Sequence, residues 1–388
     1  MATIDRRGDK YRVRYSVYEN GQRKQRNKTF DKARDAKAFA AEIEHTIQTG
    51  AYSYSGKLTL ADYLREYFDV YCGHMRPNTL TASRNYMEQH IIPYIGNIQL
   101  KALSTLQIQK VYNTIVETAY SPAKYKDING LQELVAPAKY YSPKTVHNIN
   151  GVLSTALKKA VKTNLITKNP CDNVTLPKSI TIEYVIPNKE ELKAILSSIQ
   201  KTRFYEAILT TAMLGIRRSE VLGLYWSDIS FEEKTVSIRR SLILNEATHT
   251  LEVSELKTVA SRRTLPLPEA LIKVLQDLKE KQTQLHIDIR SPFVFTTETG
   301  TPIRPASLTK CFKSAAAEAG LPKMRLHDLR HTVVTYLLEA GQSPKTVQEF
   351  VGHTDARFTL KQYAHVMEES KRQSSKVINN LFFTSTNS

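Results

Sequence analysis

A tyrosine late in the chain follows a series of cationic and imidazole side chains. Arg330 follows His327 by three positions, and Arg217 lies further upstream. Tyr363 follows His353 by ten positions. A phenol is a candidate oxygen nucleophile, and guanidinium and imidazole groups can donate to the oxygens of a phosphate under attack. This set suits cleavage of a phosphodiester without metal, because the fixed cations can neutralise charge that Mg²⁺ would otherwise neutralise.

The chain carries a large excess of positive charge. Its 388 residues include 55 lysines and arginines against 38 aspartates and glutamates, which gives a formal net charge of +17 and a pI near 9.5. Such a surplus favours a polyanion as partner, because neutralising each phosphate releases counterions. DNA is the expected polyanion, and a basic enzyme with a scattered charged face is the alternative. The length predicts two or three domains.

The three cysteines are Cys72, Cys171 and Cys311. They are odd in number, far apart and without CxxC spacing, so neither a disulfide framework nor a zinc site is expected. Residues 1–10 are polar and charged, unlike a signal peptide, and no apolar run approaches the length of a membrane span. These features predict a cytoplasmic protein with no metal and no cofactor.

The reactive residues fall in a segment, residues 179–388, whose pattern is mixed α and β. Asn188 can cap its first helix, and Ser343 and Gly352 can begin and end a later one. The pattern predicts a helix from residue 189, a helix over 204–214, strands over 236–244 and 263–267, and helices thereafter.

Residues 1–55 have the pattern of a small sheet with one helix. Strands are expected over 11–18 and 22–30 around the Asn20-Gly21 turn signal, and a helix over 32–49. Basic residues concentrate in the two strands, which makes the outer face of the sheet a candidate DNA reader. The predicted DNA-binding residues are Arg12, Arg14, Arg23, Lys24, Arg26 and Lys28, and Lys10 adds to the same charge.

Residues 56–178 read as a helical domain. Apolar residues recur at three- and four-residue steps, and Ile149, Leu153, Leu157 and Ala160 form one such stripe. Residues 120–141 lack this periodicity and are expected to form a loop or insertion. The predicted helices cover residues 59–71, 79–94, 105–118 and 145–163.

Five motifs in series resemble the catalytic domain of the tyrosine recombinases, the phage-integrase family of site-specific DNA recombinases. The agreement in order and spacing extends over roughly residues 188–370. The middle region resembles the family's helical core-binding domain more loosely, and the first 55 residues resemble the arm-binding domain of integrases from phages and conjugative transposons. The motifs are Gly215-Ile216-Arg217 with Glu220; Leu256-Lys257-Thr258 with Ser261 to Leu267; His327 to His331; Val351 to Thr354; and Tyr363 to Val366.

The resemblance implies a role for each motif residue. Taken alone, Tyr363 could pack on an apolar helix face with Leu360 and Met367, and Lys257 could be a solvated lysine. The implied roles are a nucleophile forming a 3′-phosphotyrosine (Tyr363), phosphate ligands (Arg217, Arg330), a general acid (Lys257), an aid to tyrosine deprotonation or a phosphate ligand (His327), a donor to phosphate (His353) and a supporting carboxylate (Glu220).

The expected protein is therefore a multidomain α+β integrase that inserts and excises a mobile element. Its predicted domains are an arm-type DNA-binding domain (residues 1–55), an all-α core-binding domain (56–178) and a mainly α catalytic domain with a small antiparallel sheet (179–388). Its alternatives are a type IB topoisomerase-like enzyme that relaxes DNA, and a non-catalytic DNA-binding regulator that uses a helix-turn-helix-like segment around Gly341.

The resemblance also implies partners and a location. Double-stranded DNA with core and arm sites and a homotetramer on that DNA are expected, and the resemblance leaves room for an excisionase and a host DNA-bending protein. A nucleoid-associated position in the cytoplasm follows. Residues 377–383 could pack on a neighbouring subunit or fold back on their own domain.

Overall fold

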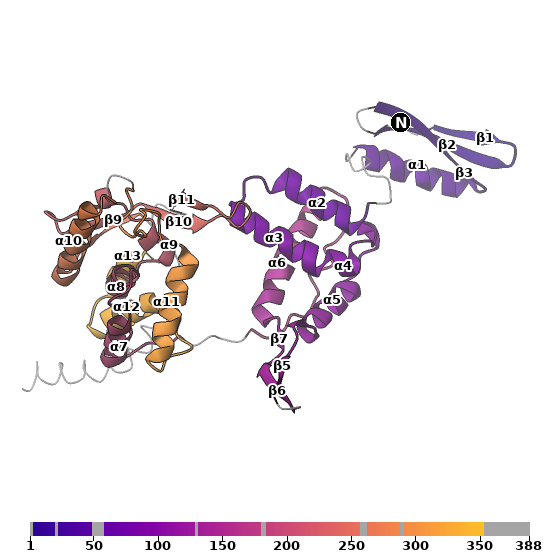
Figure 1. Ribbon diagram of the computed structural model, residues 1–388. Coiled ribbons are helices and arrows are strands. Elements are labelled where there is room, and N and C mark those ends of the chain that lie inside the picture. The colour runs from indigo at the N-terminus through magenta and orange to yellow at the C-terminus, as the bar shows by residue number, and fades with distance from the viewer. Residues whose placement is uncertain are drawn as a thin grey trace, which may run out of the picture. The chain divides into compact units, whose positions relative to one another are not determined.

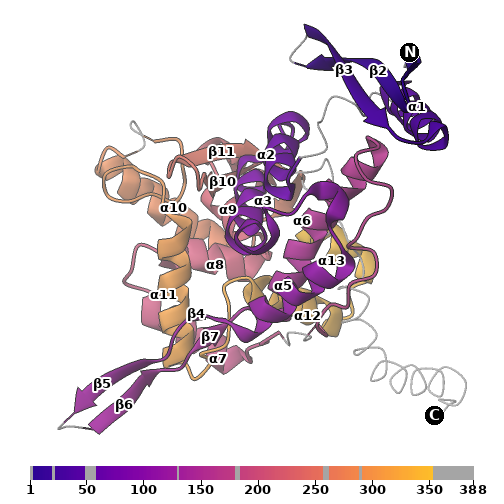
Figure 2. The ribbon, with the colours of Figure 1, turned by 90° about the vertical axis from the view of Figure 1, so that its right-hand side faces the viewer.

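The computed structural model describes residues 3–19, 22–48, 58–128, 131–179, 184–256, 262–287 and 291–352. The chain separates into two compact units, Met1–Thr181 and Ile182–Ser388. Figures 1 and 2 show the elements of each unit from two directions. Among the described helices, none combines the length and the apolar character that crossing a bilayer requires.

The N-terminal elements form an antiparallel sheet with one helix on a face. The strands, in the order β1-β2-β3, are β1 (Thr3–Arg7), β2 (Lys10–Glu19) and β3 (Gln22–Phe30), and the helix is α1 (Ala33–Gln48). Alternation along β2 turns Val13 and Tyr15 inward, where they pack with Ala36, Ala40 and Ile43 of α1. The two predicted strands and the helix are confirmed, β1 was not predicted, and the Asn20-Gly21 turn lies outside the described residues.

The next part of this unit is built from helices around a separate core. Thr59 and Ser142 cap helices through their side chains, and Ser104 forms a reciprocal capping box with Gln107. The predicted stripe from Ile149 to Ala160 is buried in this core. The helices are α2 (Leu60–Tyr71), α3 (Pro77–His90), α4 (Ile92–Ile95), α5 (Thr105–Glu117) and α6 (Pro143–Lys162), which confirms the four predicted helices.

Residues 120–141, predicted as a loop or insertion, are not a loop, because this segment forms paired strands. β4 (Ala119–Ser121) pairs with β7 (Lys139–Tyr140), and β5 (Lys124–Ile128) pairs with β6 (Leu131–Ala136). The paired strands extend away from the helices in both views (Figures 1 and 2). Strands of two to six residues are too short to show a clear period, although Asn129-Gly130 between β5 and β6 is a hairpin turn signal in the sequence.

The second unit places small antiparallel sheets beside a helical core. One sheet has the order β12-β9-β8, and β10 and β11 form a separate hairpin. The single strand predicted over 236–244 is wrong, since the run breaks at Arg239 and its halves join different sheets. The strands are β8 (Ile229–Ser230), β9 (Thr235–Ile238), β10 (Arg240–Leu244), β11 (Leu251–Glu255) and β12 (Arg263–Pro266).

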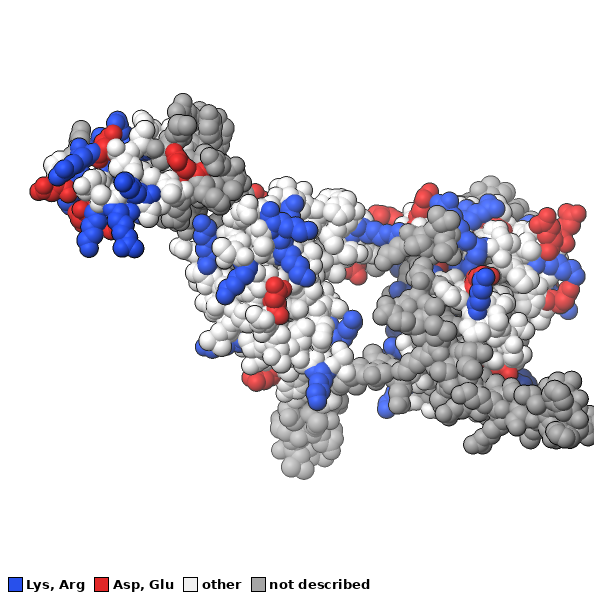
Figure 3. Space-filling model, turned by 180° about the vertical axis from the view of Figure 1, so that it is seen from behind, with Lys and Arg blue, Asp and Glu red and all other residues white. Residues whose placement is uncertain are grey.

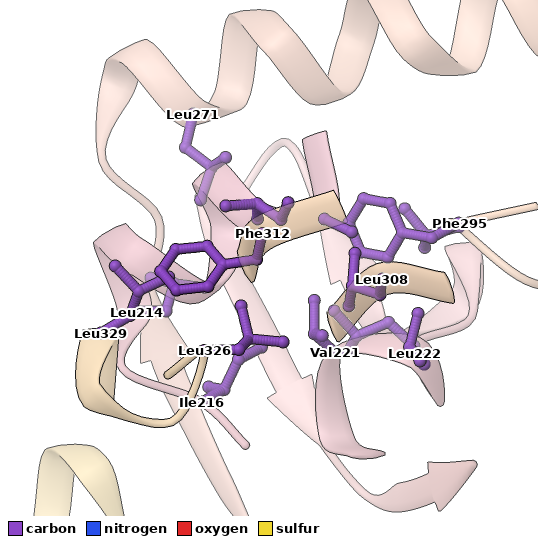
Figure 4. Packing of buried hydrophobic residues seen from close by; sticks show 14 of the residues in the cluster. Leu214, Ile216, Val221, Leu222, Leu271, Phe295, Leu308, Phe312, Leu326 and Leu329 are labelled. Carbon is purple, nitrogen blue, oxygen red and sulfur yellow. The ribbon is translucent and has the colours of Figure 1, made fainter. Parts of the chain in front are cut away.

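The helices of the second unit surround one large apolar core. Leu214, Phe312 and Leu329 meet there from three different helices, as Figure 4 shows. As predicted, Asn188 caps the first helix, and Glu191 adds the reciprocal bond of a capping box. The helices are α7 (Lys189–Ile199), α8 (Tyr205–Leu214), α9 (Arg218–Leu222), α10 (Glu269–Gln284), α11 (Pro305–Glu318), α12 (Asp328–Glu339) and α13 (Pro344–Val351).

Candidate active site

The turn that ends α8 places the first predicted phosphate ligand. Gly215 has a φ of +62°, which ends the helix in a left-handed conformation that favours glycine. A Cβ at this position would lie 3.2 Å from side-chain atoms of Val333 and Val351, so the turn is also closely packed. Ile216 enters the core, and Arg217 follows as the residue before α9. The turn thus anchors Arg217 to the core.

Arg217 is held by two oriented hydrogen bonds. Its Nη1 donates to Glu220 Oε1 at 2.6 Å, and its Nη2 donates to the carbonyl oxygen of Gly352 at 2.9 Å. Its backbone N–H also donates to Glu220 Oε2 at 3.0 Å. The side chain remains 32% exposed, so a ligand can reach it. Glu220 therefore orients Arg217, as the sequence suggested.

Glu220 is almost fully buried and sits between two guanidinium groups. Burial alone would raise its pKa, but the charges of Arg263 and Arg217 outweigh burial and hold the pKa below its usual value. The carboxylate is therefore ionised at neutral pH, and it can serve as a fixed negative anchor for Arg217.

Arg263 also belongs to the site, although its sequence motif predicted no role for it. Its side chain is 7% exposed, its Nη2 donates to Glu220 Oε2 at 3.1 Å, and its Nε donates to the carbonyl oxygen of Phe350 at 2.9 Å. Parity along β12 is a signal that could have identified it, because Arg263 stands two residues from the buried Leu265 and so faces the same side.

Arg330 lies in the first turns of α12, and among the described residues it is the largest fully buried side chain. Its Nη1 donates to the carbonyl oxygen of Gly215 at 2.8 Å. Burial and the nearby charge of Arg217 lower the pKa of Arg330 to about 9. The carbonyl of Gly215 therefore binds one predicted phosphate ligand, Arg330. The other, Arg217, follows Gly215 by two positions.

The two histidines of the His327 to His331 motif form a small aromatic group with Tyr184. The rings of His327 and His331 meet edge to face with centroids 5.0 Å apart, and the Tyr184 ring lies 3.9 Å from that of His331. His327 keeps an exposed side, yet partial burial and the charge of Arg330 lower its pKa. It is therefore neutral at pH 7 and able to accept a proton.

Asp328 holds the start of α12 in place. It is buried, and it accepts hydrogen bonds from the backbone N–H of Arg325 at 2.9 Å and from Arg325 Nη2 at 2.8 Å. These bonds close the loop just before His327, which is the residue before the helix. Asp328 thus stabilises the loop that places His327 at the start of α12.

Protonation of His331 is expected to destabilise the second unit. Burial and the neighbouring His327 lower its pKa to about 4 from an ordinary value of 6.5. The folded state thus favours the neutral ring, so this contribution to stability is complete above pH 6.5 and is lost as pH falls toward 4. The loss amounts to about 3 kcal/mol.

Urea unfolding of wild type and His331→Leu at pH 7, 5.5 and 4 measures this contribution. The only tryptophan, Trp226, lies in the second unit, and its fluorescence reports the unfolding of that unit. Wild type should lose more free energy of unfolding between pH 7 and 4 than the variant loses. Equal losses in the two proteins would contradict the prediction.

The remaining predicted catalytic residues, Lys257, His353 and Tyr363, lie outside the described residues. The structure describes what flanks them. In the sequence, β11 precedes the segment with Lys257 and β12 follows it. α13 ends at Val351, and Gly352 stands directly before His353. As predicted, Ser343 caps α13 and Gly352 ends it with a φ of +70°. The carbonyl of this last residue is the one that accepts from Arg217.

The predicted DNA-binding residues of the N-terminal sheet are divided by the strand register. Arg12 and Arg14 project from one face, where both form ion pairs with Asp5 of β1. Lys28 stands opposite Val13 and therefore lies on the other face, near the rings of Phe30 and Phe39. Arg26 shares that face by register, and Arg23 and Lys24 belong to the same strand, β3. Figure 3 shows basic side chains gathered on this sheet and helix.

The sequence matches three family descriptions in succession. Residues 3–47 match the Arm DNA-binding domain, residues 59–116 match the Phage integrase N-terminal SAM-like domain, and residues 188–370 match the Phage integrase family. The last range contains all seven residues with implied catalytic or supporting roles.

Related proteins extend over most of the chain. A Tyrosine recombinase XerC-like protein of Caldanaerobacter subterraneus is 29% identical over 377 residues, which cover 90% of each chain. The ICEBs1 integrase of Bacillus subtilis is 24% identical and covers 79% of this chain and 78% of its own length. The transposase from transposon Tn916 of Enterococcus faecalis is 28% identical over 62% of each chain.

Solved structures share the fold and confirm the predicted fold class. The Tn1549 transposon integrase, in complex with transposon right end DNA, has a TM-score of 0.65 and 22% identity, with 82% of this chain and 98% of that chain covered. A lambda integrase dimer bound to a core site has a TM-score of 0.56 and 16% identity, with 79% and 95% covered. The chain belongs to the phage integrase family of tyrosine-type site-specific recombinases.

Proposed function

We propose that this recombinase integrates and excises a mobile element through a covalent 3′-phosphotyrosine intermediate. The observation that carries the proposal is the attachment of two arginines to one turn: Arg330 donates to the carbonyl of Gly215, and Arg217 follows that residue by two positions. A pair of guanidinium groups held beside each other matches the two non-bridging oxygens of a phosphate.

The proposed cleavage exchanges one phosphoester bond for another. The Tyr363 oxygen attacks the scissile phosphorus, the bond to the 5′-oxygen breaks, and the phosphate remains on the tyrosine. Religation runs the same steps in reverse with a new 5′-hydroxyl, so the bond energy is retained and no ATP is required. Arg217 and Arg330 offset the charge that builds on the non-bridging oxygens in the transition state.

Proton transfer is assigned to the neighbouring groups. A phenol has a pKa near 10, so Tyr363 needs a base, and His327 is neutral at pH 7 because its pKa is lowered. Lys257 protonates the departing 5′-oxygen. His353 follows the glycine whose carbonyl binds Arg217, and it donates to a phosphate oxygen.

The three parts of the chain receive separate tasks in this proposal. Residues 1–55 bind arm-type sites, residues 56–178 bind core sites, and residues 179–388 cut and rejoin. Support comes from the succession of the three family matches. The arm-type residues are Arg12, Arg14, Arg23, Lys24, Arg26 and Lys28.

The working assembly is proposed to be a homotetramer on DNA in the cytoplasm, associated with the nucleoid. An excisionase and a host DNA-bending protein are proposed as directionality partners. A lambda integrase tetramer bound to a Holliday junction has the same fold, with a TM-score of 0.54 and 16% identity, which supports an assembly of this kind. The N-terminal match to an arm-binding domain favours recombination over simple relaxation of DNA.

A nicked suicide substrate, built from an end of the element that encodes the chain, tests the proposal. Cleavage next to the nick releases a short fragment, so religation fails and the adduct accumulates. A protein–DNA band that resists SDS should form in excess EDTA, because the fixed cations replace a metal ion. Loss of the band in EDTA and its return with Mg²⁺ would refute the proposed chemistry.

A further inference from the structure

One buried guanidinium connects three segments that are far apart in the sequence. Arg263 begins β12, its Nη2 donates to Glu220 of α9, and its Nε donates to the carbonyl of Phe350 in the last turn of α13. Glu220 in turn binds Arg217 through both its carboxylate oxygens. Arg263 therefore fixes the carboxylate that fixes the proposed phosphate ligand.

The same guanidinium packs against the end of α13. A Cβ built on Gly352 would lie 2.9 Å from Arg263 Nη1 and 3.1 Å from its Cζ, both too close for a side chain there. The carbonyl oxygen of Gly352 also accepts the hydrogen bond from Arg217 Nη2. The position of this glycine is thus defined from one side by Arg263 and from the other by Arg217.

Because Arg263 and Glu220 are buried, the loss of either charged group would leave the other without its partner in a poorly solvated site. Desolvation lowers the pKa of Arg263, and Glu220 offsets part of that effect. A buried carboxylate that loses one of two cationic partners reorients toward the other or admits water. Either change would move the Arg217 guanidinium, since both of its side-chain hydrogen bonds end on groups that Arg263 contacts.

We propose that Arg263 is a positioning residue for strand cleavage. It holds Glu220 and the C-terminal end of α13 in register, so that Arg217 and the carbonyl of Gly352 keep a fixed separation. The inference rests on the proposed function, because the groups that it positions are the proposed catalytic ones.

Arg263→Met and Arg263→Lys test this role, with Arg262→Met as a matched control. Arg262 is the adjacent residue, it is 55% exposed, and it pairs with the exposed Glu255. Single-turnover cleavage of a suicide substrate at saturating DNA should fall about ten- to a hundredfold in both Arg263 variants, as expected for a displaced reactive group. DNA affinity should stay within about threefold of wild type, and Arg262→Met should cleave at the wild-type rate.

A double-mutant cycle separates positioning from a general loss of structure. If Arg263 acts through Arg217, adding Arg263→Lys to Arg217→Lys should slow cleavage less than about threefold beyond Arg217→Lys alone. Independent penalties that multiply would overturn the inference. If Arg263→Met fails to fold by Trp226 fluorescence, Arg263→Lys decides, and a near-wild-type rate in that variant would overturn it as well.

Different results would refute the proposed function and the positioning role of Arg263. A wild-type protein that forms no adduct would refute the proposed function. A wild-type adduct together with undiminished cleavage by Arg263→Lys would refute only the positioning role.

Discussion

Tyr363→Phe should form no covalent adduct with a suicide substrate, although it should bind the DNA about as tightly as wild type. Phenylalanine retains the ring and its packing but lacks the oxygen that bonds to phosphorus. Because that oxygen forms the covalent bond, the expected loss is complete rather than partial. The measurement is the fraction of labelled DNA retained with the protein after SDS denaturation.

A second tyrosine provides the control for this loss. Tyr336 lies in the same unit, and its hydroxyl donates to the carbonyl of Pro187 at 2.6 Å. Tyr336→Phe should lose about 1 kcal/mol of stability and keep the adduct. The chain has 20 tyrosines, so an adduct that persists in Tyr363→Phe would show that another of them is the nucleophile.

Arg217→Lys should bind DNA nearly as well as wild type and cleave it on the order of a hundredfold more slowly, or worse, which corresponds to about 3 kcal/mol of transition-state stabilisation. The charge is conserved, but the geometry is not. Arg217 holds Glu220 and the Gly352 carbonyl through different nitrogens, and a single ammonium cannot hold both and still donate to a phosphate.

The adjacent arginine distinguishes geometry from charge. Arg218 is exposed, and its Nη1 donates to Thr309 Oγ1 at 2.9 Å. Arg218→Lys should therefore cleave at a rate within about twofold of wild type, because a solvated contact of this kind contributes little. Single-turnover rates at saturating DNA compare the two variants. A rate for Arg217→Lys within a few-fold of wild type would count against a phosphate ligand at this position.

Elements with local signals were predictable from the sequence, and elements defined by distant partners were not. The helix after Asn188 was foreseen because its capping box lies within four residues. The strands β5 and β6 were missed although Asn129-Gly130, a hairpin turn signal, separates them in the sequence, because neither flanking run shows a clear apolar alternation. The break at Arg239 was missed because apolar residues recur at even positions on both sides of it (Val236, Ile238, Leu242 and Leu244), while the two halves join different sheets.

The site shows the same contrast. Arg217, Arg330 and Glu220 could be identified because their motifs resemble those of a known family, and the structure brings them together. Their roles, and those of Lys257, His353 and Tyr363, stay predictions. Arg263 received no role because its two partners, Glu220 and Phe350, lie 43 and 87 positions away, and no spacing rule covers such distances.

The turn at Gly215 has a consequence for grafting this chemistry onto other scaffolds. One guanidinium is hydrogen-bonded to a backbone carbonyl and the other extends from the same backbone two residues later, so the two are related through three consecutive residues. Lengthening or shortening α8 leaves that relation unchanged, whereas inserting a single residue after the glycine would displace one cation from the other. A designer who wishes to transplant the pair must therefore move the loop intact and supply a helix whose side chain reaches back to it.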